Sequence, residues 1–197
     1  MSAISDVMSG LQVTSTWQER VYKDLHAHPE LSFHETKTAA FVASKLKELG
    51  YEVLEQIGRT GVIGVQRNGA DQTVLARADM DTVSVRENTG LPYASTLTAA
   101  NDAEKTVSVA HACGHEPHVT CLLGASELLA KALQSWRGTF IALFQPAEEV
   151  AGGAKTKKIA STFQSHFGPD TVFTLGLQTA SEDFSAIPAA LGTPYTY

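Results

Sequence analysis

Three apolar segments that read as β-strands are each followed directly by reactive polar side chains. Residues 73–78 lead into Asp79 and Asp81, residues 107–112 into Cys113 and His115, and residues 139–144 into Glu148 and Glu149. In open α/β sheets, sites form outside the carboxyl ends of the strands. The sequence therefore predicts a functional site where the three strand ends meet.

Segments with helical periodicity alternate with these strands. Apolar residues recur at helical spacing in residues 17–25 and 41–49, and each run follows an apparent capping box, at residues 16–19 and 32–35. Pro29 is expected to end the first of these helices, and Gly50 the second. A third helix is expected to begin near Pro117. This alternation predicts an α/β fold with three layers, αβα, built on a mainly parallel sheet. A further helix is expected at residues 154–164 and a last strand at residues 172–177.

One antiparallel hairpin is expected within this sheet. Residues 62–66 and 73–78 flank an Asn-Gly pair at 68–69, which is a strong hairpin signal. Residues 1–13 are expected to form a flexible leader, and residues 14–197 a single catalytic-type domain.

Composition excludes several classes of protein. The net charge is −6 and there is no basic run, so neither nucleic acid nor an anionic membrane is an expected partner. Cys113 and Cys121 are too few and too close for a disulfide framework, which favours a reducing compartment. The first residues lack the pattern of a secretory signal, and no apolar run approaches the roughly 20 residues of a membrane span. A cytoplasmic location is expected.

The histidine-cysteine cluster and the glutamate pair together predict a metal site. His111, Cys113 and His115 lie within five residues, and Glu148 and Glu149 follow about thirty residues later. Imidazole, thiolate and carboxylate are the ligands of a metal such as zinc. Neighbouring side chains in an extended segment diverge, so one glutamate can bind metal while the other faces a water. The spare carboxylate is what metal-assisted hydrolysis needs as its base.

Other assignments stay open for the remaining polar residues. Asp79 and Asp81 share one side and could orient a ligand histidine, although a plain turn after the strand is the alternative. His118 is a further candidate for contact with a ligand or a substrate. A different enzyme class would use Cys113 as the nucleophile and His115 as its base.

Four motifs occur in the order in which a known family carries them. They lie at residues 26–33, 77–81, 111–115 and 144–149. The chain resembles the zinc-peptidase-like amidohydrolases: aminoacylases, hippurate hydrolases and indole-acetyl-amino-acid hydrolases. The resemblance implies a binuclear Zn or Mn hydrolase whose partners are small molecules, N-acyl amino acids or related amides.

The same resemblance implies a role for each residue of the site. Cys113 would bridge the metals, His115 would be a terminal ligand, and Glu149 a further ligand. Glu148 would be the general base that moves the proton during amide hydrolysis.

The sequence also departs from the family pattern. Family members are longer and carry a lid or dimerisation domain after a strand that ends in Gly-Leu-His. Here Gln178 stands at the place of that histidine, so the insert is expected to be missing near 178. The chain ends at Tyr197, before the last expected histidine ligand. Glu116 stands where the family usually has Asp. Asp is the better helix N-cap, so the longer side chain is expected to lower local stability by ~0.5–1 kcal/mol.

Because of these departures, we expect weaker metal binding and doubt the catalytic activity of this chain. We expect at most one weakly held metal ion and no dimer of the family type. A truncated, catalytically inactive paralogue is therefore the alternative to an active hydrolase.

Overall fold

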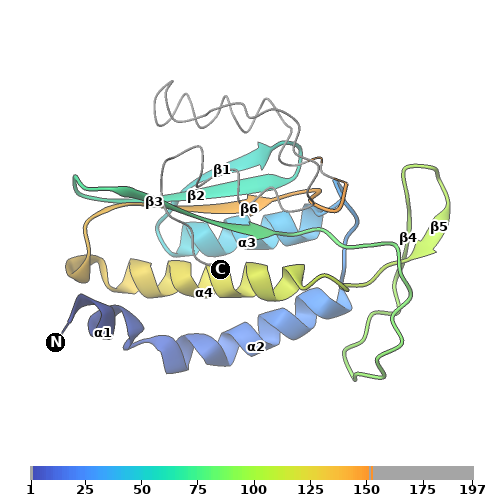
Figure 1. The fold of residues 1–197 in the computed structure, drawn as a ribbon, viewed down its shortest axis with the longest axis horizontal. Coiled ribbons are helices and arrows are strands. Elements are labelled where there is room, and N and C mark those ends of the chain that lie inside the picture. Colours follow the sequence, from blue (N-terminus) through green and yellow to red (C-terminus); the bar gives the residue numbers. More distant parts are fainter. Residues whose placement is uncertain (1, 151, 153–197) are drawn as a thin grey trace.

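The computed structural model describes residues 2–150 and residue 152 (Figure 1). Helices and strands alternate along the chain, as expected for an α/β protein. In chain order they are α1 (Ala3–Met8), α2 (Leu11–Ala27), α3 (Thr36–Glu48), β1 (Glu52–Ile57), β2 (Gly61–Asn68), β3 (Thr73–Asp79), β4 (Thr98–Ala100), β5 (Thr106–Ser108), α4 (His115–Lys131), a 3-10 turn (Leu133–Ser135) and β6 (Gly138–Gln145).

The main sheet is mixed, with the described strands in the order β1-β2-β6-β3. β1 pairs with β2, and β2 with β6, in antiparallel fashion, whereas β3 and β6 are parallel. Asp79 pairs with Gln145 in this register. The carboxyl ends of β3 and β6 therefore lie side by side at one edge of the sheet, where the sequence predicts the site.

The hairpin expected around residues 68–69 is wrong. β6 lies between β2 and β3, so that Phe144 pairs with Val62 on one side and with Ala78 on the other. Phe144 is fully buried, as is most of β6, and so apolar a strand is favoured at the centre of a sheet. The antiparallel hairpin is formed instead by β1 and β2.

The strand expected at residues 107–112 does not join the main sheet. β5 covers only Thr106–Ser108 and pairs with β4 in a separate two-stranded sheet. Beyond it, Ala110 makes an isolated bridge with Val83. Cys113 thus lies just before α4 and His115 is its first residue, so the start of this helix, and not a strand of the main sheet, places the two residues.

Helix α1 was not expected, and α2 begins earlier than expected. α2 begins at Leu11, and the Thr16 hydroxyl donates to the Gln12 carbonyl inside the helix instead of capping its end. Residues 1–13, expected to be a flexible leader, contain α1 and the first turn of α2. The end of α2 at Ala27, before Pro29, agrees with the sequence prediction.

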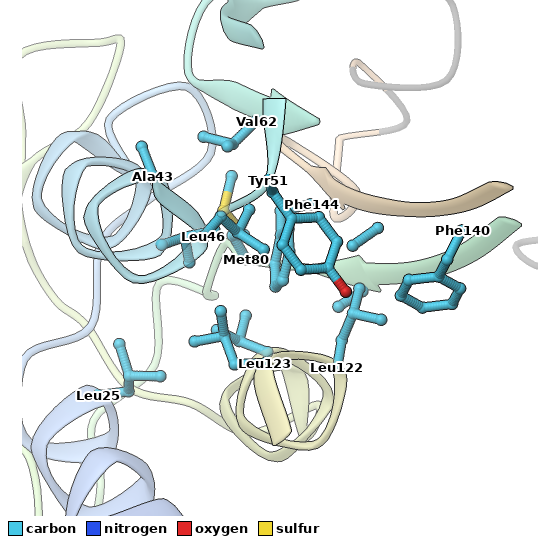
Figure 2. Packing of buried hydrophobic residues seen from close by; sticks show 14 residues of the cluster. Leu25, Ala43, Leu46, Tyr51, Val62, Met80, Leu122, Leu123, Phe140 and Phe144 are labelled. Carbon is cyan, nitrogen blue, oxygen red and sulfur yellow. The ribbon is translucent and has the colours of Figure 1, made fainter. Parts of the chain in front are cut away.

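α3 and α4 cover one face of the sheet, and α2 packs on the outer side of α4 (Figure 1). The core between these helices and the sheet includes Leu46 of α3, Leu123 of α4 and Phe144 of β6 (Figure 2). On the other face, Ile63 and Ile141 are also buried. The helix and strand expected at residues 154–164 and 172–177 lie outside the described residues, as does Gln178. None of the helices described is long and apolar enough to cross a membrane.

Candidate metal centre

Three elements bring four polar side chains to one edge of the sheet. Asp79 ends β3, His115 opens α4, and Glu148 and Glu149 follow β6. Asp79, His115 and Glu148 each offer a ligand atom within 4.8 Å of the others. The structure thus gathers the side chains that the sequence expects to converge, although His115 arrives on a helix.

The His115 ring has a fixed orientation. Nδ1 lies 2.9 Å from the Asp81 carbonyl oxygen, which can only accept, so Nδ1 carries the hydrogen. Nε2 then faces three carboxylates, at 3.6 Å from Asp79 Oδ2, 3.7 Å from Glu149 Oε1 and 3.8 Å from Glu148 Oε2. These distances are too long for hydrogen bonds, so the carboxylates surround a space rather than the nitrogen itself.

The electrostatics of this space favour a cation. Burial by itself lowers the pKa of His115, but the hydrogen bond to Asp81 and the charge of Asp79 outweigh it and raise the pKa to about 9. Burial, followed by the charge of Asp79, raises the pKa of Glu148 above its usual value. An imidazole nitrogen and several carboxylates around one space are a donor set that fits a divalent metal such as Zn or Mn.

Asp81 organises the surroundings of the site from a fully buried position. Its Oδ1 accepts from the Glu148 amide at 3.0 Å, and its Oδ2 accepts from the Glu149 amide at 3.0 Å and from Ser32 Oγ at 2.6 Å. Burial raises the pKa of Asp81, yet hydrogen bonds from His115, Ser32 and the two amides overcome that effect and lower it. Asp81 therefore favours its anionic form, and its backbone carbonyl holds the His115 ring, while its role in orienting a metal ligand stays a prediction.

Cys113 lies next to the acidic cluster and is exposed. A hydrogen bond to Glu149, and then burial, raise the pKa of its thiol to about 12. The thiolate required of a metal ligand would form only beside a cation. The bridging role of Cys113 stays a prediction, as does the division of roles between Glu148 and Glu149, which lie almost equally far from His115.

The carboxylate of Asp79 itself faces the space beside His115. Its Oδ2 faces His115 and lies 3.3 Å from Arg77, while its Oδ1 lies 2.6 Å from Nδ1 of His118. Arg77 also donates to the Gln145 side chain at 2.7 Å. Asp79 thus belongs to the group of side chains that could hold a metal ion, and His118 contacts Asp79 from the exposed side.

The sequence missed two residues that support the site. Ser32 and Glu35 were expected to form a capping box at the start of α3. Ser32 instead donates to Asp81, and the fully buried Glu35 accepts from the Ala147 amide at 2.8 Å and does not cap α3 with its side chain. Both interactions cross long stretches of chain, so nothing in the local sequence indicates them.

Glu116 was expected at the N-cap of a helix, which is wrong. Gly114 is the N-cap of α4, and Glu116 is buried in the first turn. Its Oε1 lies 2.8 Å from Nδ1 of His26, whose Nε2 lies 3.0 Å from Glu87. His111 Nδ1 lies 3.3 Å from the other oxygen of Glu116. His26 thus joins the end of α2 to the start of α4 beside the metal centre.

Comparison with known proteins agrees with this site. Residues 75–194 match the family model described as peptidase family M20/M25/M40. The chain belongs to that family. The matched region contains every residue of the candidate metal centre, from Asp79 to Glu149.

Relatives of this M20-family chain include named enzymes. It is 46% identical over 156 residues to the hippurate hydrolase of Campylobacter jejuni, a match covering 79% of this chain and 38% of that protein. It is 37% identical over 168 residues to the N-acetyl-L-cysteine deacetylase of Bacillus subtilis, covering 81% of this chain and 38% of that protein. The chain thus spans well under half the length of these relatives.

A solved structure gives the same picture of the fold. The Bacillus subtilis YXEP protein, described as a dinuclear metal binding peptidase of the M20 family, superposes with a TM-score of 0.67 at 33% identity. The match covers 77% of this chain and 40% of that one. The α/β fold of the M20-family chain is therefore that of a known metal peptidase.

Proposed function

We propose that this chain carries the metal centre of an amidohydrolase that cleaves the amide bond of N-acyl amino acids or related amides. The observation that carries the proposal is the orientation of His115, whose free Nε2 faces the carboxylates of Asp79, Glu148 and Glu149. Membership of the family supports it. The two relatives support it too, because their names, hippurate hydrolase and N-acetyl-L-cysteine deacetylase, refer to N-acylated amino acids.

Cys113, His115 and Glu149 would hold the metal, Zn or Mn, with Asp79 within reach. When bound, the metal supplies Lewis-acid chemistry: it polarises a carbonyl group and lowers the pKa of a water. Asp81 fixes the His115 tautomer so that Nε2 is free to act as a ligand.

Glu148 would move the proton. Its pKa is raised by burial and by Asp79, which brings the carboxyl closer to the pKa at which a general base also serves as an acid. It would take a proton from the attacking water and deliver it to the leaving nitrogen of the amide.

A cysteine nucleophile fits the site less well. A nucleophilic thiol needs a lowered pKa and a positively charged setting. The thiol of Cys113 has a raised pKa of about 12 and faces the carboxylate of Glu149. The acidic surroundings instead favour a metal ligand.

We also expect the protein to be cytoplasmic. The proposed activity is tested by measuring hydrolysis with the purified 197-residue chain. N-benzoylglycine and a series of N-acetyl amino acids would be incubated with the protein after removal of metal and after addition of Zn or Mn, and the released amine measured. We expect hydrolysis only with metal. Equal and negligible release under all conditions would overturn the proposal for this chain. Inactivation by iodoacetamide without any effect of a chelator would favour the cysteine mechanism instead.

A further inference from the structure

Three consecutive backbone amides after β6 all donate to two buried carboxylates. The Ala147 amide donates to Glu35 Oε1 at 2.8 Å, and the Glu148 and Glu149 amides donate to the two oxygens of Asp81, each at 3.0 Å. Both carboxylates have no exposed surface. The turn that presents the glutamate pair is thus held by acceptors from two other parts of the chain.

This turn needs such support because its backbone is strained. Ala147 has φ 53, in the left-handed region that disfavours residues other than glycine, and it is fully buried. A residue keeps this conformation only where its surroundings fix it. The Ala147 carbonyl accepts from the Gly152 amide at 2.8 Å, and the Ala147 amide donates to Glu35, so the peptide groups on both sides of Ala147 are held.

Glu35 is itself held from its far side. Thr60, in the turn between β1 and β2, donates its hydroxyl to Glu35 Oε2, while Oε1 accepts from Ala147. Burial raises the pKa of Glu35, and these hydrogen bonds oppose that effect. Glu35 therefore connects the start of α3, the β1–β2 turn and the glutamate turn in one buried contact.

We propose that Glu35 is a positioning residue of the metal centre: its carboxylate fixes the turn at residues 147–149 so that Glu148 and Glu149 face His115. Glu35 itself touches neither His115 nor the space around it in the described contacts. Its effect on metal binding rests on the proposed function, whereas its effect on the order of the turn does not.

The two-sided contact of Glu35 defines the variants. In Glu35→Gln, the side-chain oxygen can accept from the Ala147 amide, and the amide group can donate to the Thr60 hydroxyl, so the bridge is kept. In Glu35→Ala, the Ala147 amide is left buried without a partner. Glu127→Ala is the matched control, because Glu127 lies toward the far end of α4 and accepts from Thr14 and Trp17.

The first measurement is hydrogen exchange of residues 144–150 in the metal-free protein. Glu35→Ala should exchange the amides of residues 147–149 about tenfold faster than the wild type, because their protected conformation opens more often. Glu35→Gln and Glu127→Ala should exchange this segment at the wild-type rate. If Glu35→Ala does not fold, Thr60→Val, which leaves Glu35 Oε2 without its donor, should produce a smaller acceleration in the same segment.

The second measurement is titration with Co²⁺, followed by its visible absorption. Glu35→Ala should bind Co²⁺ about 10-fold more weakly and shift the absorption bands, as expected when a residue that orients ligands is removed. Glu35→Gln should restore the wild-type affinity and spectrum, which a purely destabilising change would not do.

Each outcome decides one part of the proposal. Unchanged exchange in Glu35→Ala, or equal acceleration in Glu127→Ala, would overturn the role of Glu35 in fixing the turn. Faster exchange with unchanged Co²⁺ binding would overturn its role in positioning the metal ligands. Absence of Co²⁺ binding by the wild type would count against the proposed function, while the exchange data would still accept or reject the effect on the turn.

Discussion

His115 faces more negative charge than its own proton can balance. Its Nδ1 hydrogen is directed at the Asp81 carbonyl, and its Nε2 faces Asp79, Glu148 and Glu149. Burial lowers the pKa of the ring, but the hydrogen bond to Asp81 and the charges of Asp79 and Asp81 outweigh it and raise the pKa to about 9. A divalent ion balances more of this charge than a proton does, so metal binding should displace a proton from the site.

Two single substitutions should separate catalysis from metal binding. Glu148→Gln should lower any amidase activity on the order of 10²-fold or more while the metal content stays, because the proton carrier is lost but the ligands are kept. Cys113→Ser should lower the metal content first. Activity assays and elemental analysis on the same samples check both, and loss of metal from the Glu148 variant would mean that the roles of the two glutamates are reversed.

His111 should make the protein sensitive to mild acid. Burial, more than any other effect, lowers its pKa from 6.5 to about 4. Between these two pH values the His111 ring is neutral in the folded chain, whereas it takes up a proton in the unfolded chain. A depressed pKa of this kind stabilises the fold above pH 6.5 and loses that contribution as the pH falls toward 4.

The expected loss can be measured by denaturant unfolding. Between pH 7 and pH 5, the free energy of unfolding should fall by about 1–2 kcal/mol on account of this one group. His111→Asn should show a correspondingly shallower dependence on pH in the metal-free protein. An identical pH dependence in the variant and the wild type would contradict this assignment.

Among the secondary-structure elements, β6 connects the centre of the sheet to the glutamate pair of the site. It lies between β2 and β3, and its carboxyl end leads to the glutamate pair. Its first residue, Gly138, has φ 115, and a Cβ there would lie 2.4 Å from the backbone oxygen of Gln72. The entry of β6 into the sheet thus requires glycine for both conformation and space.

Gly138→Ala should therefore destabilise the fold more than a glycine-to-alanine substitution at a position where a Cβ has open space. Backbone strain and the clash with Gln72 should together lower the free energy of unfolding by roughly 2–4 kcal/mol. Gly50→Ala is the control, because Gly50 also has a positive φ, of 82, but no atom lies within 4 Å of a Cβ placed there. Equal losses in the two variants, measured by denaturant unfolding, would show that the clash contributes nothing.

For the molecule as a whole, the metal centre connects parts of the chain that are distant in sequence. α4, β3 and the segment after β6 each supply a group to one space, and loops from residues 30–36 support it. A metal held by groups from several elements stabilises the folded state, in which those groups lie together, more than the unfolded chain.

Addition of metal should thus raise the stability of the whole chain. At a Zn²⁺ concentration about 100-fold above the dissociation constant, the free energy of unfolding should rise by about 2.7 kcal/mol, and a chelator should reverse the change. Glu149→Gln should reduce the effect by weakening the site. Thermal unfolding with and without Zn²⁺ checks this, and an unchanged midpoint in the wild type would count against a site built from these residues.

Local patterns predicted several elements well. The end of α2 before Pro29, the end of α3 before Gly50, the start of α4 around Pro117 and the apolar strand β6 all depend on nearest neighbours in the chain. The failures involve pairing. An Asn-Gly pair indicates a turn at residues 68–69, but only the competition among strands decides that β6 pairs with both β2 and β3.

The sequence by itself determined the family and the α/β class, and it predicted which residues would form the site, because these depend on residue types and spacings. The tertiary structure decided how the side chains meet. It placed His115 on a helix rather than after a strand of the main sheet, brought Asp79 to the side of Nε2, and gave Glu35 a buried contact with Ala147. Such contacts join residues far apart in the chain, and their geometry follows from packing that no local pattern encodes.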